Sequence, residues 1–407
     1  MAQSLREVAQ SLKNANKKVQ LIYAFNGTGK TRLSREFKEL IAPKIVDAGD
    51  ENISGIKVFY YNAFTEDLFF WDNDLDYDTD RNLKIQPNSY TTWALIEQGQ
   101  ESNITKHFQR YTNDKLTPNF NVEYTIKDKN DNDVIIPAYS EVRFSFERGN
   151  DDPSEIVKIS KGEESCFIWS VFYSLLEQII SVLNVAEESE RETDQFNDLQ
   201  YVFIDDPVSS LDDSHLIELA VNVAELIKSS QSDELKFIIT THNPLFYNVL
   251  FNEFKSSDSR YSYKPKHCVK KRLEKLNDGT FDLIDQPKDS PFAYHLFLLN
   301  ELEKVAISGD IQKYHFSFLR NILEKTSTFL GFYEWKKLLP DEAEGSREGY
   351  YNRIINLSNH SKFSGEEISA LTNQEKDVLK HLVQEITRMY NFKSNINQVI
   401  PEENGTI

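Results

Sequence analysis

AFNGTGKT, residues 24–31, is the stretch that decides the fold of this chain. Residues 19–25 are mostly apolar and predict a buried strand, and residues 31–40 have the spacing of a helix. A strand, a glycine-rich turn and a helix form a phosphate-binding loop, in which backbone N–H groups at the helix N-terminus surround the phosphates. The stretch therefore predicts a nucleotide-phosphate site on an α/β sheet.

The last two residues of this loop have specific expected roles. Lys30 is expected to bridge the terminal phosphates, and the Thr31 hydroxyl is expected to hold Mg²⁺. The first position of the usual pattern is Ala24 instead of glycine, but the rest of the loop is small enough for backbone to approach phosphate closely. We expect nucleotide binding by Asn26, Gly27, Thr28, Gly29, Lys30 and Thr31.

A second predicted strand, residues 201–204, ends in two carboxylates. Asp205 is expected to join Thr31 in the metal shell, and Asp206 to orient or deprotonate the water that attacks the nucleotide. An acidic turn after a core strand would have the same sequence. The phosphate-binding loop upstream favours the catalytic interpretation.

Three further segments complete a pattern that resembles an ABC-type ATPase head: residues 159–163, 210–212 and 241–242. In such heads the serine and glycine corresponding to Ser160 and Gly162 grip the γ-phosphate bound to a second head. Asp212 would lie in the D-loop, and His242 would sense the γ-phosphate. The resemblance implies a homodimer or a higher even oligomer that uses ATP or GTP with Mg²⁺.

Simpler interpretations of these segments stay open. Ser160 with the acidic residues after it could only cap a helix, and His242 could be an ordinary residue at a strand end. ABC heads usually have glutamate at the second carboxylate position. The shorter Asp206 makes its efficiency as a base an open question.

Composition limits the class of protein. The 407 residues have a net charge of −19, and the acidity lies in residues 1–260, which hold 26 basic and 44 acidic residues. This balance argues against a general nucleic-acid coating role. Only two cysteines occur, Cys166 and Cys268, far apart, which fits a reducing cytosol. We find no signal peptide and expect no membrane span, so a cytoplasmic location is predicted.

The expected organisation is an α/β P-loop NTPase head of ABC type at residues 1–263, with a distinctive insertion at 63–150. No sustained heptad repeat occurs, so the long coiled-coil arm of DNA-repair and chromosome ATPases is not expected. A basic run at 264–272 marks the expected boundary. Residues 264–407 are expected to form a mainly α-helical domain.

The C-terminal part contains a candidate group of catalytic residues. Arg320 and Glu324 are four residues apart and so share one helix face, and His360 follows in a polar turn. A Glu, a His and an Arg could cleave RNA without a metal, by moving protons and by stabilising charge on the phosphorane. The simpler interpretation is an exposed ion pair worth a few tenths of a kcal/mol.

The chain resembles the PrrC-type anticodon nucleases over nearly its whole length. The resemblance is carried by YAFNGTGKTRLSREFK, YYNAFTEDLFFWDND, ISKGEESCFIWSVFY, YVFIDDPVSSLDD, FIITTHNPLFYNVLFNE, FLRNILEKTSTFLG and INLSNHS. It implies Arg320, Glu324 and His360 as the nuclease triad. It further implies cleavage of tRNA(Lys) in the anticodon loop 5′ of the wobble base, leaving a 2′,3′-cyclic phosphate and a 5′-hydroxyl.

The same resemblance implies regulation and recognition. A type Ic restriction–modification complex would keep the enzyme latent until a phage disables restriction, GTP would be hydrolysed, and dTTP would be a stabiliser. Lys288, Asp289 and Ser290 resemble the anticodon-recognition stretch, but they could also be a turn before a helix. The basic run would contact phosphates of the anticodon stem or form a solvated linker.

Two rival functions remain at this point. One is a DNA-repair or DNA-binding ATPase of the same head family, and the other is a non-catalytic protein whose head switches a partner. The missing coiled-coil arm argues against the first rival. Incubation with tRNA and nucleotide would distinguish all three functions.

Overall fold

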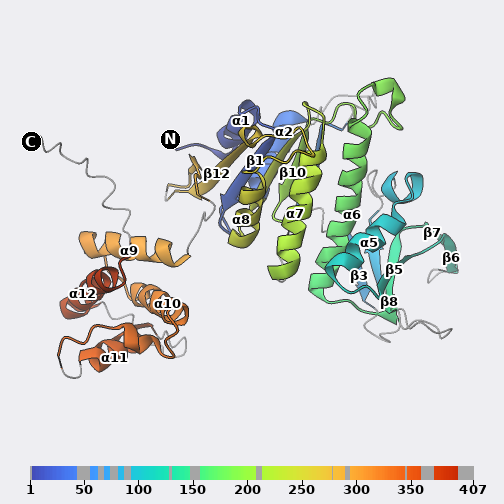
Figure 1. Cartoon of the computed structure of the whole chain (residues 1–407). Helices are drawn as coiled ribbons and strands as arrows, with labels where there is room; N and C mark the ends of the chain where they lie inside the picture. Colours follow the sequence, from blue (N-terminus) through green and yellow to red (C-terminus); the bar gives the residue numbers. More distant parts are fainter. Residues whose placement is uncertain are drawn as a thin grey trace, which may run out of the picture. The chain divides into compact units, whose positions relative to one another are not determined.

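A computed structural model of the chain shows two compact units, Met1–Pro291 and Phe292–Ile407 (Figure 1). The structure describes residues 2–43, 56–62, 68–73, 81–86, 93–127, 131–146, 156–207, 213–276, 278–288, 294–343, 346–358 and 371–392.

The first unit is built on a six-stranded sheet with the strand order β13-β12-β1-β11-β10-β2. The central strands are parallel, and only β13 runs antiparallel to its neighbour. Largely apolar runs form β1, β2, β10 and β11, because both faces of this part of the sheet are covered. In sheet order the strands are β13 (Phe281–Asp285), β12 (Cys268–Lys275), β1 (Val19–Ala24), β11 (Lys236–Thr241), β10 (Tyr201–Asp205) and β2 (Val58–Tyr61).

Helices cover both faces of this sheet. On one face, apolar residues of α1 (Leu5–Asn14) and α2 (Lys30–Ile41) pack against alternate residues of the strands. On the other face, the ring of Tyr23 meets Tyr247 of α8 (Pro244–Glu253), and Phe59 stacks on Phe172 of α6 (Lys161–Leu183). Helix α7 (Asp213–Ser229) packs against α8. The result is the α/β layering that the sequence predicted.

The insertion expected at residues 63–150 contains a second, antiparallel sheet of order β3-β4-β8-β5 and a separate hairpin, and β9, which follows the expected insertion, pairs with β8. Helix α5 (Glu101–Tyr111) and this sheet pack on α6 through Phe108, Phe144 and Phe167. The strands are β3 (Phe69–Asn73), β4 (Arg81–Ile85), β5 (Leu116–Phe120), β8 (Glu141–Phe146) and β9 (Ile156–Val157), and the hairpin is β6 (Tyr124–Lys127) and β7 (Asp133–Ile136).

The boundary expected after residue 263 is wrong. Residues 268–285 form β12 and β13, and β12 pairs with the P-loop strand β1 from Val19↔Cys268 to Ala24↔Leu273. Gln3 closes the same edge, because its backbone exchanges two hydrogen bonds of 2.8 Å with Phe281. The basic run, for which the sequence left a phosphate contact or a solvated linker open, therefore leads into a pair of strands and is not a linker, and the first unit extends to Pro291.

Helix α6 corrects a second expectation. By length and composition it could cross a membrane, although the sequence interpretation expected no such stretch. Of its most apolar 18-residue window, 83% is buried inside the first unit. This burial is typical of a core helix, which explains the apolar run without a lipid environment.

All of the regular secondary structure described in the second unit is helical. Four helices surround one apolar core that includes Leu302, Leu319, Ile354 and Leu382. The helices are α9 (Tyr294–Ser308), α10 (Tyr314–Phe329), α11 (Ser346–Ser358) and α12 (Asn373–Met389), with a short 3₁₀ turn at Trp335–Leu338. The expected fold class, an α/β P-loop unit followed by a mainly helical one, is confirmed.

Candidate functional site

The glycine-rich loop joins β1 to α2 and has the backbone conformation that phosphate binding needs. Gly27 has φ +78° and Gly29 has φ +103°, values that residues with a Cβ rarely adopt. A Cβ at Gly29 would also touch Leu5 at 3.6 Å and Phe281 at 3.8 Å. The turn therefore requires glycine, and it directs the first N–H groups of α2 toward one point.

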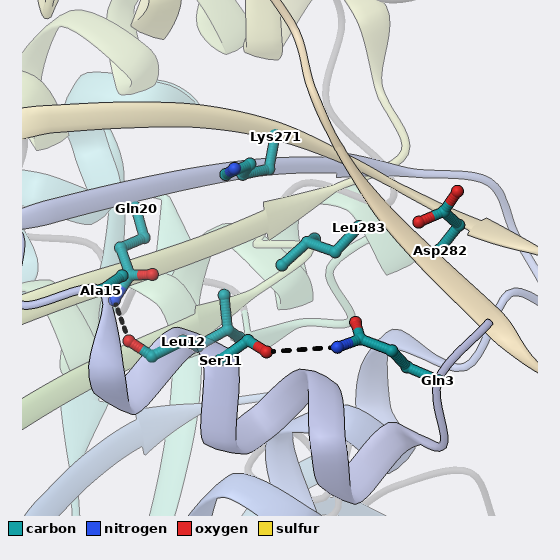
Figure 2. A pocket seen from close by; sticks show the side chains of 8 residues that line it. All are labelled: Gln3, Ser11, Leu12, Ala15, Gln20, Lys271, Asp282 and Leu283. Carbon is teal, nitrogen blue, oxygen red and sulfur yellow. Dashed lines mark hydrogen bonds between the residues drawn. The ribbon is translucent and has the colours of Figure 1, made fainter. Parts of the chain in front are cut away.

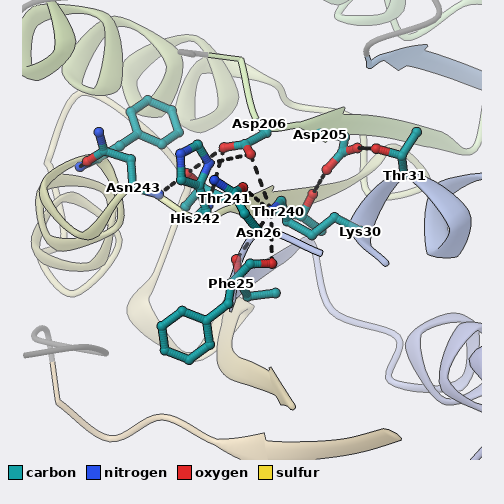
Figure 3. Close-up of polar contacts among 12 residues, drawn as sticks. Phe25, Asn26, Lys30, Thr31, Asp205, Asp206, Thr240, Thr241, His242 and Asn243 are labelled. Atoms are coloured by element: carbon teal, nitrogen blue, oxygen red, sulfur yellow. Dashed lines mark hydrogen bonds and ion pairs between the residues drawn. The ribbon is translucent and has the colours of Figure 1, made fainter. Parts of the chain in front are cut away.

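Lys30 lies across the mouth of the loop, with a side chain only 7% exposed (Figure 3). Its ammonium donates to the carbonyl oxygens of Ala24 and Phe25 and to Oδ1 of Asn26, each at 3.3 Å. The same Nζ lies 3.3 Å from Oδ2 of Asp206. A buried charge needs such partners, and these partners direct the ammonium to the space where terminal phosphates would lie.

Asp205 and Thr31, the two residues expected to bind the metal, are in direct contact. The Thr31 hydroxyl donates to Oδ2 of Asp205 at 2.7 Å, and the Thr240 hydroxyl donates to Oδ1 at 2.5 Å. Burial raises the pKa of Asp205 above its ordinary value. A hydroxyl and a carboxylate side by side are the oxygen ligands that Mg²⁺ prefers, so these residues fit a nucleotide-bound magnesium ion.

Asp206 is the centre of a second set of contacts, at the ends of β10 and β11. Its φ of +54° is unusual for a residue with a side chain, and its N–H donates to the Thr240 carbonyl at 2.9 Å. Its carboxylate accepts from the backbone N–H of His242 at 3.2 Å and pairs with His242 Nδ1. Burial alone would raise the pKa of Asp206, but the His242 hydrogen bond and the Lys30 charge outweigh burial and lower it.

The sheet order explains why these residues meet. Strand β11 lies between the P-loop strand β1 and the carboxylate strand β10. The carboxyl ends of parallel strands lie at one edge, where ligands of α/β sheets bind. The structure therefore brings the loop, both carboxylates and His242 together, as their positions in the sequence predicted.

Ser160 and Gly162 lie at the start of α6. Ser160 is the N-cap, because its Oγ accepts from the Glu163 N–H at 3.3 Å and the Glu163 carboxylate accepts from the Ser160 N–H at 2.6 Å. Ser160 is exposed at this helix end. The capping interpretation is thus confirmed, and gripping a second head's nucleotide stays a prediction. Asp212 lies outside the described residues.

The candidate nuclease residues lie in the second unit. On α10, Arg320 Nε donates to Glu324 Oε1 at 2.8 Å, with the two side chains 33% and 41% exposed. Arg320 Nη1 lies 3.5 Å from the hydroxyl of Ser358, and Ser317 Oγ lies 3.4 Å from its carbonyl. Ser358 is the last residue of α11. His360 lies outside the described residues, two positions further along the chain.

The candidate anticodon-reading stretch belongs to the first unit instead of the second, as the division after Pro291 shows. Lys288 is exposed after β13, and its carbonyl accepts from Gln286 Nε2 at 2.9 Å. Asp289 and Ser290 lie outside the described residues. Substrate contact by these residues stays a prediction.

Sequence reasoning missed three polar contacts. Thr240 and Thr241 hold the carboxylates of Asp205 and Asp206, the latter through a bond of 3.2 Å. Ser358 contacts Arg320 from a different helix. Two consecutive threonines at the end of an apolar strand were a readable signal, whereas nothing in the sequence placed Ser358 beside α10.

A separate pocket of about 330 Å³ lies between α1 and the β12–β13 edge, away from the loop (Figure 2). Buried Gln20 donates from Nε2 to the Leu12 carbonyl at 2.8 Å, and its Oε1 has no hydrogen-bond partner. No predicted site residue lines this pocket, whose walls are Gln3, Ser11, Leu12, Ala15, Gln20, Lys271, Asp282 and Leu283.

Comparison with known proteins identifies the family. No protein-family model matches the chain. An Escherichia coli protein named "Anticodon nuclease" is 49% identical to this chain over an alignment of 419 residues, gaps included. The alignment covers 96% of this chain and 98% of the relative. The chain belongs to the anticodon nuclease family. Its first unit is an α/β unit with a P-loop.

Solved structures add little to this assignment. The SMC head domain from Thermotoga maritima has a TM-score of 0.28 at 12% identity, covering 67% of this chain and 91% of that one. An SmcHead bound to the C-winged helix domain of ScpA has a TM-score of 0.29 at 12% identity, covering 67% and 90%. Scores this low carry no argument, and the family assignment rests on the sequence relative.

Proposed function

We propose that this protein is a nucleotide-regulated endoribonuclease that cleaves a tRNA in its anticodon loop. The observation that carries the proposal is the 49% identity to a protein named anticodon nuclease along nearly the full length of both chains. The P-loop geometry of the first unit supports nucleotide binding and hydrolysis as the regulating event.

The cleavage is proposed to use Arg320, Glu324 and His360. Attack by the ribose 2′-hydroxyl on the adjacent phosphorus forms one P–O bond, and loss of the 5′-oxygen breaks the other. Glu324 and His360 would take the 2′ proton and protonate the departing oxygen. The Arg320 guanidinium would stabilise the phosphorane charge, and its contacts to Glu324 and Ser358 support a fixed orientation.

The finer features of the reaction rest on the family resemblance. The proposed substrate is tRNA(Lys), cut 5′ of the wobble base to leave a 2′,3′-cyclic phosphate and a 5′-hydroxyl. Lys288, Asp289 and Ser290 are proposed to read the anticodon. The proposed place of action is the cytoplasm, in a latent complex with a type Ic restriction–modification enzyme.

The head is proposed to act as a dimer, or a higher even oligomer, that binds ATP or GTP with Mg²⁺; dTTP is a further candidate ligand. When bound, the magnesium–nucleotide supplies the phosphoanhydride bond and a Lewis acid. Thr31 and Asp205 would hold the metal, Lys30 would leave Asp206 for the phosphates, and Asp206 would accept the proton of the attacking water. Ser160, Gly162, Asp212 and His242 would contact the γ-phosphate region.

Incubation of the purified protein with total tRNA tests the proposal. Reactions with ATP, GTP or dTTP are followed by labelling of new 5′-hydroxyl ends and mapping of the cut. A single cut in an anticodon loop is expected, and Glu324→Gln should reduce it by about 10²–10⁴-fold while nucleotide hydrolysis continues. If no nucleotide gives a discrete anticodon cut, the proposal is wrong.

A further inference from the structure

The C-terminal end of α10 presents a turn of exposed apolar residues, FLGFY at 329–333, which we name the aromatic turn. Phe329 is 95% exposed and Tyr333 is 99% exposed, and Leu330 and Phe332 are exposed as well. Large apolar side chains grouped in this way are uncommon on a protein surface unless the surface binds something.

The turn is held in a defined shape. Gly331 has φ +75°, the Phe332 N–H donates to the Ser327 carbonyl at 2.8 Å, and the Gly331 N–H donates to the Thr328 carbonyl at 3.3 Å. These bonds form a Schellman cap, the common glycine-containing end of a helix. The exposed rings are therefore presented by an ordered backbone, which reduces the entropy lost when a partner binds.

The aromatic turn lies on the helix that carries the candidate nuclease pair. The Thr328 hydroxyl donates to the Glu324 carbonyl at 2.9 Å, and Phe329 is the fifth residue after Glu324. At 1.5 Å per residue the axial distance from Glu324 to Phe329 is about 7.5 Å. At about 100° per residue Phe329 is also turned about 140° around the axis from Glu324, so an RNA that reaches both residues must pass around the end of the helix.

The charge around the turn favours a polyanion. Residues 325–337 hold three lysines and one glutamate, in a chain whose net charge is −19. Lys325 and Lys337 are exposed, and Lys336 pairs with Glu348. Exposed rings with lysines beside them are the features that bind single-stranded RNA, where bases stack on aromatic side chains and lysines meet phosphates.

We infer that Phe329 and Tyr333 form a stacking platform for unpaired bases of the RNA loop, at the end of the helix that carries Arg320 and Glu324. The inference rests on the proposed function, because it takes an anticodon loop as the RNA. The platform holds bases that take no part in the cleavage chemistry. By holding them, it determines which phosphate of the loop reaches the candidate triad.

The affinity of the full-length chain for an anticodon stem-loop RNA of tRNA(Lys) tests the platform. Each variant carries Glu324→Gln in addition, so that the RNA stays intact. Phe329→Ala and Tyr333→Ala should each raise the Kd about tenfold, the effect typical of one lost stacking contact. Tyr333→Phe keeps the ring and should stay within about twofold. Ile307→Ala, an exposed apolar residue on α9, is the matched control and should leave the Kd unchanged.

Salt dependence separates stacking from charge. Loss of a ring should leave the slope of log Kd against log salt unchanged, whereas Lys337→Ala should reduce it by about one. An unchanged Kd for the double variant Phe329→Ala/Tyr333→Ala overturns the inference. A fall in oligomer mass with an unchanged Kd also overturns it and assigns the turn to a protein contact.

The platform and the proposed function can fail separately. If chain without substitutions cuts no tRNA but the ring variants still weaken binding of the stem-loop, the proposed reaction is wrong and the RNA platform remains. If the chain without substitutions cuts tRNA and the ring variants bind the stem-loop as tightly as Glu324→Gln alone does, the platform is wrong and the reaction remains. Nucleotide hydrolysis, measured in each variant, checks that the head is intact.

Discussion

The nucleotide site of the first unit and the candidate nuclease site of the second are built in different ways. Asp205 is 3% exposed and accepts hydrogen bonds from two hydroxyls on different elements, whereas the side chains of Arg320 and Glu324 are 33% and 41% exposed on a single helix. The first geometry is fixed by three parallel strands. The second depends on one helix and on how the end of α11 reaches it, so a small local change should alter it more easily.

Removal of the candidate nuclease carboxylate is the sharpest way to separate the two sites. We expect Glu324→Gln to reduce tRNA cleavage by about 10²–10⁴-fold, the range for loss of a general acid or base, with nucleotide hydrolysis unchanged. Quantitative end-labelling measures the first and phosphate release the second. Asn321→Ala, an exposed neighbour on α10, is the control and should retain cleavage. Full cleavage by Glu324→Gln would remove Glu324 from the triad.

The matching change in the head is Lys30→Ala. Loss of a preorganised charged donor should reduce nucleotide hydrolysis by about 10²–10³-fold and leave the Arg320–Glu324 pair as it is. Lys38→Ala, two turns later on α2, should hydrolyse normally. Steady-state phosphate release measures both variants. Hydrolysis by Lys30→Ala at the parent rate would contradict the P-loop assignment.

Asp206→Asn tests whether the second carboxylate activates water. Asparagine tolerates the positive φ of this position, so the backbone should be preserved. We expect single-turnover hydrolysis to fall about 100-fold because the proton acceptor is lost. Nucleotide affinity should change little, which equilibrium binding of a nucleotide analogue measures. If hydrolysis is unchanged, Asp206 does not activate water, and its role is limited to its contacts with Lys30 and His242.

The smallest expected effects separate capping from catalysis at α6. Ser160 and Ser4 are both N-caps with a capping box, but only Ser160 belongs to the resemblance to ABC heads. Each serine-to-alanine change should lower the free energy of unfolding by about 1 kcal/mol. Only Ser160→Ala should also slow hydrolysis at concentrations where heads associate. Equal hydrolysis in the two variants would make Ser160 a cap and nothing more.

The head could be predicted from the sequence because its motifs and its apolar strands independently indicate the same fold. The strands expected at residues 19–25 and 201–204 are present within a residue at each end, and they bring Lys30 and Asp206 together. Long apolar runs that end in polar residues leave few alternatives for a buried parallel strand.

The boundary could not be predicted because basic side chains concealed a strand. In β12 the Lys270 ammonium lies 3.9 Å over the Phe251 ring, Lys271 pairs with Asp285 at 2.7 Å, and Arg272 pairs with Glu274 at 2.8 Å. Long basic side chains cover apolar surface with their stems and keep the charge in water. A strand made of them therefore has the composition of a linker.

The nuclease region depended on the family resemblance. Spacing alone placed Arg320 and Glu324 on one face, which is also the spacing of an ordinary ion pair. Their contact with Ser358 comes from the packing of α10 against α11, which no local pattern encodes. Tertiary packing between distant segments is the information that a single sequence does not display.

The backbone pairing of Gln3 with Phe281 decides how this protein can be cut into working parts. A fragment that stops at residue 263 would lack β12 and β13. Strand β1 would then lose β12 as a partner on one side, and Gln3 would lose its pairing with Phe281. An open edge of this kind recruits other chains into aggregates. A fragment ending at Pro291 keeps every pairing of the main sheet, and it is the smallest head that should be expressed by itself.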